Sequence, residues 1–261
     1  MIFIANWKMN LTKKESLELT KNIVKKFKNQ IEIKKNKLDI ILCPSFVSLS
    51  DVQKILSNSS IKFGAQNVFW EEKGAFTGEI SASMLKKIGC QYVIIGHSER
   101  RQYLKETDEI INEKIKICLK FGLKPILCIG EKSLKTNKPS IVEQLKKDLK
   151  GISQKKIEKI IIAYEPIWAI STNSTGKICS PKRAVEKIKI IRKTISDFFN
   201  LAQNQKIKIL YGGSVNHANI KSFTDQSDID GVLVGGASLK INEVVKMIEQ
   251  IELLKHKNIK T

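Results

Sequence analysis

Short apolar segments alternate with longer segments of helical period along the whole chain. Each short segment is rich in Ile, Leu or Val and is bounded by Gly, Pro, Asn or Ser, which is typical of β-strands. Nearly every position in these segments is apolar, as expected of parallel strands that are buried on both faces. The eight predicted strands are Ile2–Ala5, Leu38–Cys43, Ile61–Ala65, Tyr92–Ile95, Pro125–Ile129, Ile160–Tyr164, Ile207–Tyr211 and Val232–Val234.

The segments between these strands carry apolar residues at helical spacing, for example Ile111, Ile115 and Cys118. Side chains that can cap a helix start precede several of the predicted helices. These residues are Thr12, Ser45, Thr107 and Ser180, the last of which is followed by Pro181.

Eight strand-then-helix units in 261 residues predict one α/β domain over residues 1–261, a (β/α)8 barrel with a parallel eight-stranded sheet. An open doubly wound sheet is the alternative, but it typically has fewer strands in a chain of this length. No linker, low-complexity insert or shift in composition indicates a second domain, although Lys132–Ser140 is a polar loop.

The charge adds a second possible kind of function. Lys and Arg number 46 against 26 Asp and Glu, so the net charge is +20, which invites a nucleic-acid or polyanion partner. Only four of the basic residues are Arg, and the 42 Lys are scattered through predicted helices, which favours solvated helix faces. We therefore expect no specific nucleic-acid partner, and we keep a Lys-rich polyanion-binding barrel as the alternative function.

The sequence also indicates where the protein works. It has no apolar run long enough for a transmembrane helix and no basic leader at its N-terminus. Its cysteines, an odd set without a C-x-x-C pair, are typical of buried thiols in a reducing compartment. They are Cys43, Cys90, Cys118, Cys128 and Cys179. We expect a cytoplasmic protein without membrane contact.

In a (β/α)8 barrel the chemistry gathers at the C-terminal ends of the strands, which here carry a few polar side chains. Glu165 follows a strand directly and precedes Pro166, so its carboxylate is poorly solvated and suited to act as a base. His97 begins a short predicted helix, whose backbone N–H groups disfavour the imidazolium. A capping Glu and a structural His are the alternatives for these two residues.

Other strand ends offer groups for an anion. Asn6 and Lys8 leave the first strand together, and an amide and a cation can bind an anionic oxygen. Gly212-Gly213-Ser214 and Gly235-Gly236 follow the last two strands, where barrels often bind phosphate through backbone N–H groups. No cofactor fingerprint, nucleophile arrangement or clustered set of metal ligands is present, so the set favours proton transfer beside a carbonyl on a small phosphorylated molecule.

Seven motifs, in order, make the chain resemble the triosephosphate isomerase family over essentially its whole length, with the TIM-barrel fold. They are Ala5-Asn6-Trp7-Lys8-Met9-Asn10, Gly64-Ala65-Gln66-Asn67, Gly74-Ala75-Phe76-Thr77-Gly78-Glu79, Gly96-His97-Ser98-Glu99-Arg100-Arg101, Ala163-Tyr164-Glu165-Pro166-Ile167-Trp168-Ala169, Tyr211-Gly212-Gly213-Ser214-Val215 and Asp230-Gly231-Val232-Leu233-Val234-Gly235-Gly236-Ala237-Ser238-Leu239.

The resemblance implies interconversion of dihydroxyacetone phosphate and D-glyceraldehyde 3-phosphate through an enediol or enediolate, without a cofactor or metal. It implies that Glu165 is the base, that His97 is the electrophile, and that Lys8 and Asn6 bind and polarise the substrate. Further residues receive roles in the same way. Glu99 is a partner of Lys8, and Ser214, Gly235 and Gly236 contact the phosphate. Tyr211 and Ser214 also hold the closed lid, the loop that follows Ile170.

The resemblance also implies a homodimer, formed through a loop at Phe76-Thr77-Gly78 that completes the neighbouring site. One segment departs from the family pattern. After Ile170 the family usually continues Gly-Thr-Gly-Lys, whereas this chain has a longer run from Ser171 to Lys177. Ser171 stands where a backbone N–H normally binds phosphate, and that donor survives only if the local dihedrals suit a residue with a Cβ.

Overall fold

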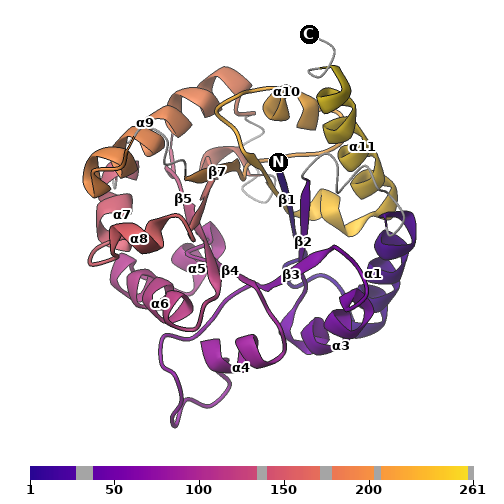
Figure 1. The fold of residues 1–261 in the computed structure, drawn as a ribbon, viewed down its shortest axis with the longest axis horizontal. Coiled ribbons are helices and arrows are strands. Elements are labelled where there is room, and N and C mark those ends of the chain that lie inside the picture. The colour runs from indigo at the N-terminus through magenta and orange to yellow at the C-terminus, as the bar shows by residue number, and fades with distance from the viewer. Residues whose placement is uncertain (28–37, 134–139, 171–177, 203–206, 258–261) are drawn as a thin grey trace.

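The eight strands form a closed barrel in which every strand is parallel to its neighbours and follows them in chain order (Figure 1). This computed structural model describes residues 1–27, 38–133, 140–170, 178–202 and 207–257. The strands are β1 (Ile2–Asn6), β2 (Asp39–Cys43), β3 (Lys62–Ala65), β4 (Tyr92–Ile95), β5 (Lys124–Ile129), β6 (Ile161–Tyr164), β7 (Lys208–Tyr211) and β8 (Gly231–Val234). The predicted parallel barrel is confirmed, and each strand boundary lies within one residue of its predicted place.

Helices surround the strands as an outer ring (Figure 1). They are α1 (Lys13–Phe27), α3 (Phe46–Leu56), α4 (Ala82–Lys87), α5 (Ser98–Tyr103), α6 (Asp108–Lys120), α7 (Ile141–Asp148), α8 (Gln154–Ile157), α9 (Pro181–Phe199), α10 (Ile220–Thr224) and α11 (Ile241–Lys257), with 3₁₀ turns η1 (Ile167–Ala169) and η3 (Gly236–Leu239). No helix in the described residues is long and apolar enough to span a membrane.

Three of the four predicted caps are observed. Thr107 accepts the N–H of Ile110, Ser180 accepts the N–H of Arg183, and Thr12 accepts the N–H of Glu15. Ser45 is the N-cap residue of α3 as predicted, but its side chain makes no capping hydrogen bond. The N–H of Ser48 donates to the backbone carbonyl of Ser45 instead, so the first turn is satisfied without the hydroxyl.

The strand residues divide into two apolar layers, which explains why the strand segments are apolar at nearly every position. Along β4, Tyr92 and Ile94 point into the barrel, whereas Val93 and Ile95 pack against the helices. All five cysteines are buried and free. The barrel interior contains Ile2, Ile4, Ile41, Cys43, Tyr92, Ile94, Ile126, Cys128, Ile161, Ala163, Leu210 and Leu233. The C-terminal ends of the strands are therefore held on a packed core.

Candidate active site

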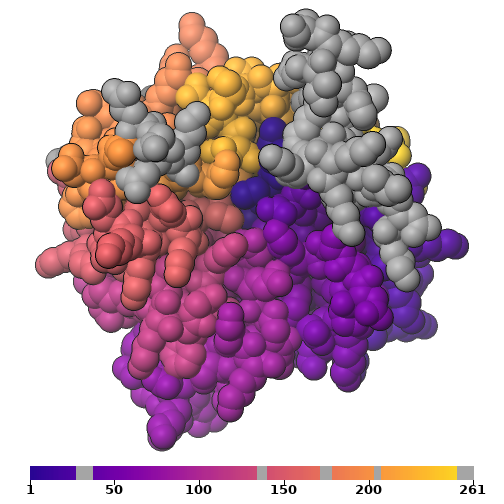
Figure 2. Space-filling view, viewed as in Figure 1, coloured from indigo at the N-terminus to yellow at the C-terminus, as the bar shows by residue number. Residues whose placement is uncertain are grey.

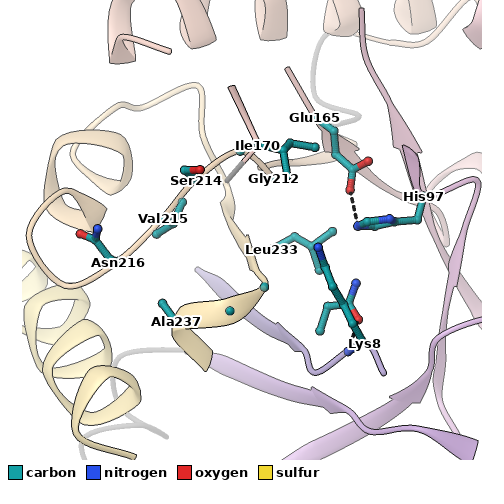
Figure 3. A pocket seen from close by; sticks show the side chains of 14 residues that line it. Lys8, His97, Glu165, Ile170, Gly212, Ser214, Val215, Asn216, Leu233 and Ala237 are labelled. Carbon is teal, nitrogen blue, oxygen red and sulfur yellow. Dashed lines mark hydrogen bonds and ion pairs between the residues drawn. The ribbon is translucent and has the colours of Figure 1, made fainter. Parts of the chain in front are cut away.

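A pocket opens at the C-terminal ends of the strands and brings most of the predicted site residues together (Figure 3). Glu165 and His97 face each other on one side of it, and Ser214 lies on the other side. The lining residues are Asn6, Lys8, His97, Glu165, Ile170, Gly212, Gly213, Ser214, Val215, Asn216, Leu233, Gly235, Gly236 and Ala237. Glu99 and Tyr211 do not line this pocket, and Ser171 lies outside the described residues.

Glu165 is almost completely buried, with 2% of its surface exposed. Its N–H donates to the carbonyl of Ile129 (2.7 Å), and a Cβ on Gly130 would lie 1.7 Å from the Glu165 carbonyl oxygen. Only glycine at position 130 therefore allows the ends of β5 and β6 to approach this closely. The carboxylate is held through Oε2, which accepts the N–H of Ser98 at 3.0 Å.

The other oxygen of Glu165 faces the imidazole. Oε1 lies 3.2 Å from His97 Nε2, and it has no aligned hydrogen-bond partner among the described residues. An oxygen without such a partner remains available to accept a proton.

His97 caps the N-terminus of α5, and its Nδ1 accepts the N–H of Glu99 at 3.3 Å. With Nδ1 accepting this hydrogen bond, a ring proton is assigned to Nε2, the nitrogen that faces Glu165. The carboxylate of Glu99 also approaches Nδ1, at 3.4 Å, but Lys8 Nζ binds this carboxylate at 2.6 Å. Glu99 is thus held in an ion pair with Lys8.

Lys8 has a left-handed backbone conformation, with φ = 52°. Such a conformation costs a residue with a Cβ roughly 1–2 kcal/mol, so other contacts must hold it. The N–H of Lys8 donates to Asn6 Oδ1 (3.1 Å), and Gln66 Nε2 donates to the carbonyls of Lys8 and Cys43 (both 2.9 Å). The role of Gln66 was not predicted from the sequence, although its place at the end of β3 could have indicated one.

The opposite side of the pocket is formed by backbone rather than by charged side chains. A Cβ on Gly213 would lie 2.2 Å from the Tyr211 hydroxyl oxygen, so the Tyr211 side chain occupies the space that glycine leaves. Tyr211 is buried and stacks on Phe223 with the ring centroids 4.0 Å apart. A Cβ on Gly236, in contrast, would meet nothing within 4 Å. The turns therefore leave open space beside exposed backbone at Gly236.

The segment that follows β6 is anchored by a buried carboxylate. Glu131 Oε1 accepts the hydroxyl of Tyr164 at 2.9 Å and the indole N–H of Trp168 at 3.2 Å. Burial raises the pKa of the Tyr164 phenol, which stays protonated and donates. Ile170 and Leu233 add an apolar wall that the sequence analysis did not predict, because which strand residues face the pocket depends on barrel closure.

This arrangement can move a proton on a small anionic substrate. The Glu165 carboxylate, the His97 imidazole and the Lys8 ammonium group meet in a cavity beside open backbone. Among the described residues, no group of three or more His, Cys, Asp or Glu could hold a metal ion. The side chains in the pocket can offer an acid, a base and a positive charge.

Comparison with known proteins points to one family. A family model described as "Triosephosphate isomerase" matches residues 1–251. The chain is 50% identical over 243 residues to the protein of that name from Dictyoglomus turgidum, covering 92% of this chain and 94% of the relative. It is 45% identical over 251 residues to the one from Caldanaerobacter subterraneus (95% and 98%) and 46% over 262 residues to the one from Dehalococcoides mccartyi (99% and 99%).

Proposed function

This chain belongs to the triosephosphate isomerase family, and we propose that Glu165, His97, Lys8 and Asn6 carry out its reaction. The reaction is the interconversion of dihydroxyacetone phosphate and D-glyceraldehyde 3-phosphate, an aldose–ketose isomerisation of glycolysis and gluconeogenesis. The observation that carries the residue roles is the 3.2 Å approach of Glu165 Oε1 to His97 Nε2 beside Lys8.

In the proposed mechanism, Glu165 Oε1 removes the carbon-bound proton next to the substrate carbonyl. The Nε2 proton of His97 is directed at the carbonyl oxygen, and His97 then moves protons between the two oxygens of the enediol or enediolate. Lys8 Nζ stabilises the negative charge that develops on oxygen. Glu99 binds Lys8 Nζ, and Asn6 binds the Lys8 N–H, so both residues support the position of the cation.

The phosphate is proposed to bind at the ends of β7 and β8, through Ser214 and the backbone N–H groups of Gly235 and Gly236. The open space at Gly236 supports this placement, since close approach of an anion to backbone needs room. Ser171 remains a prediction from the sequence for the same phosphate, as does the role of Tyr211 with Ser214 in holding the lid.

We also propose that the protein is a homodimer through the loop at Phe76-Thr77-Gly78. Residues 74–79 are exposed, and the loop between β3 and α4 projects from the body of the molecule (Figures 1 and 2). Met9 is 96% exposed and Leu104 59%, beside a second cavity that shares Lys8 and His97 with the first pocket. A partner's loop seated in this cavity would cover these apolar side chains and rigidify the catalytic groups.

We propose that residues 1–261 act as one catalytic domain and that the protein works in the cytoplasm. The five free, buried cysteines support a reducing compartment. Nothing favours the alternative of a polyanion-binding barrel.

An assay that couples the isomerised product to a dehydrogenase tests the residue roles. Glu165→Gln is expected to fold normally and to lower kcat by at least about 10³-fold, because an amide cannot accept the substrate proton. Glu165→Asp keeps the carboxylate but, with one methylene fewer, places it farther from the substrate. It is expected to retain part of the activity. Near-normal activity in Glu165→Gln would refute the assignment of the base.

Sedimentation combined with the same assay tests the dimer. Thr77→Asp is expected to lower dimer content and activity together, because it places a charge in the proposed contact. The matched control is Ser153→Asp, at the exposed N-cap residue of α8, away from the proposed contact. It is expected to change neither dimer content nor activity. A fully active monomeric wild type would contradict the dimer proposal.

A further inference from the structure

Arg101 on α5 binds groups from four other parts of the chain. Its Nε donates to the carbonyl of Gly96 (2.8 Å) and its Nη2 to the carbonyl of Cys128 (3.3 Å). Nη1 donates to Asp108 Oδ1 and Nη2 to Asp148 Oδ2, both at 2.6 Å. One guanidinium therefore joins the ends of β4 and β5 to the start of α6 and the end of α7.

The two carbonyls that Arg101 binds lie at the strand ends that carry the catalytic groups. Gly96 immediately precedes His97, and the thiol of Cys128 contacts the carboxylate of Glu165. Gly96 has φ = 70°, and a Cβ there would lie 3.0 Å from Arg101 Nη2, so glycine admits the guanidinium. The first turn of α5 supplies the N–H groups that bind His97 and Glu165, and the same short helix carries Arg101.

This cluster contains more negative than positive charge. Asp148 is fully buried, the side chains of Asp108 and Arg101 are each 14% exposed, and Lys147 reaches Asp108 only from the surface, at 3.7 Å. Asn112 donates to the backbone carbonyl of Asp148 and leaves the carboxylate untouched. Asp148 Oδ1 has no hydrogen-bond partner among the described residues, so Arg101 is the one cation that holds this carboxylate there.

The position of Asp148 is unfavourable for a carboxylate. It is the last residue of α7, where the helix dipole disfavours negative charge. Burial raises the pKa of Asp148 to about 7, with the charge of Asp108 adding to the effect and that of Arg101 opposing it. The Cys128 thiol, whose pKa burial also raises, stays neutral and does not titrate with it.

The raised pKa has a definite consequence for stability. Below the unfolded value, near 3.8, Asp148 is protonated in both states, whereas between about 4 and 7 only the folded state keeps the proton. The group therefore favours the folded state less and less as pH rises through this range. A neutral side chain at position 148 avoids this cost at pH 8, while Asp108 still pairs with Arg101, so the variant should be more stable there.

We propose that Asp148 is a positioning residue for the isomerisation, which fixes Arg101 and, through it, the strand ends that orient His97 and Glu165. The inference rests on the proposed function of that pair. A carboxylate that lowers stability is useful there because the guanidinium must be held against two backbone carbonyls. Small displacements of reacting groups lower turnover strongly, whereas substrate contacts on the other side of the pocket are unaffected.

The test compares the wild type with Asp148→Asn, which is isosteric and uncharged. At pH 8 we expect kcat to fall about fivefold with KM changed less than twofold. The thermal midpoint should rise by about 3 °C at pH 8, with a smaller rise at pH 5. The wild-type kcat should show an ionisation near pH 7 that the variant lacks, and the NMR signals of the His97 ring should shift while those of His217 do not.

Two further variants separate the possible failures. Asp197→Asn removes an exposed carboxylate that pairs with Lys193, and it should leave kcat, the pH profile and the thermal midpoint unchanged. If Asp148→Asn keeps wild-type kcat and pH profile, or if it lowers the thermal midpoint and kcat together, the positioning role is wrong. Substantial activity in Glu165→Gln would instead overturn the function on which the inference rests.

Discussion

The two sides of the pocket are built by different means. On the side of β4–β6 the pocket is lined by the titratable side chains of Glu165 and His97, which are held by the N–H groups of Ser98 and Glu99. Behind them, Arg101 is bound by two carboxylates. On the side of β7 and β8, glycines and exposed backbone form the wall.

The difference fits the roles proposed for the two sides. A proton transfer requires a base and an acid aligned within a fraction of an ångström, and a flexible side chain reaches that precision only when its neighbours hold it. An anion such as phosphate is bound by several N–H groups at once, which requires backbone that can be approached closely. Substitutions on the first side should therefore change turnover, and those on the second should change substrate affinity.

The largest effect should come from His97→Ala. Removing the imidazole takes away the Nε2 proton donor, so kcat should fall by about 10³-fold, while KM changes little. Steady-state kinetics with a circular dichroism spectrum as the folding control measure this. If KM rose about 10³-fold instead and kcat stayed the same, His97 would act in substrate binding, like the residues at the ends of β7 and β8.

Gly213→Ala should have the next largest effect, on stability as well as on affinity. Its Cβ would lie 2.2 Å from the Tyr211 hydroxyl, and Tyr211 cannot move freely because it is buried against Phe223. Such overpacking costs about 1–3 kcal/mol, so the thermal midpoint should fall and KM should rise. An unchanged thermal midpoint would show that Tyr211 can shift away.

Gly236→Ala offers the sharper version of the same test. The added methyl group meets nothing within 4 Å, so the thermal midpoint should not change. It would occupy space beside the backbone where the phosphate is proposed to lie, and KM should rise about tenfold with kcat nearly constant. A variant with wild-type KM would place the phosphate elsewhere in the pocket.

The smallest expected effect concerns a surface pair beside the β7 turn. His217 Nδ1 lies 2.7 Å from Glu243 Oε1, and this hydrogen bond lowers the pKa of the Glu243 carboxyl. A lowered pKa stabilises the folded state above the unfolded value, near 4.5, and the contribution is lost as pH falls through the folded value.

Because the pair is at the surface, Glu243→Gln should lower the thermal midpoint by only about 1 °C at pH 7 and by less at pH 3. High salt should reduce the difference. A fall of many degrees in the thermal midpoint would show that the β7–β8 side of the molecule depends on charged contacts for stability as strongly as the β4–β6 side.

Much of the fold follows from local patterns in the sequence. The strand segments are apolar at nearly every position because Tyr92 and Ile94 face the barrel while Val93 and Ile95 face the helices. Both sets of positions are buried, so each strand stands out from its polar surroundings. The candidate residues could be predicted as well, since strand ends in such a barrel converge on one face.

What could not be predicted are partners that depend on how distant elements meet. Arg101 and Asp148 lie 47 residues apart, and nothing local to either residue indicates the other. Gln66 reaches Lys8 across the ends of three strands, which requires the barrel to be closed. Leu233 belongs to the barrel interior and lines the pocket, whereas its equally apolar neighbours Val232 and Val234 pack on the helix side. Register and closure decide these contacts, and neither is a property of a short segment.

The seam between β1 and β8 has a consequence for how the protein becomes active during its synthesis. Ile2 pairs with Gly231. A Cβ at position 231 would lie 2.0 Å from the Ile2 carbonyl oxygen, so only glycine allows the two strands to approach this closely. Lys8 meets Gly235 across the same seam. The first and the last strand thus contribute to the same pocket. The pocket therefore cannot form until almost the whole chain has been synthesised. Contacts between residues distant in sequence form slowly, so closure of the barrel between β1 and β8 is the slow step expected in folding.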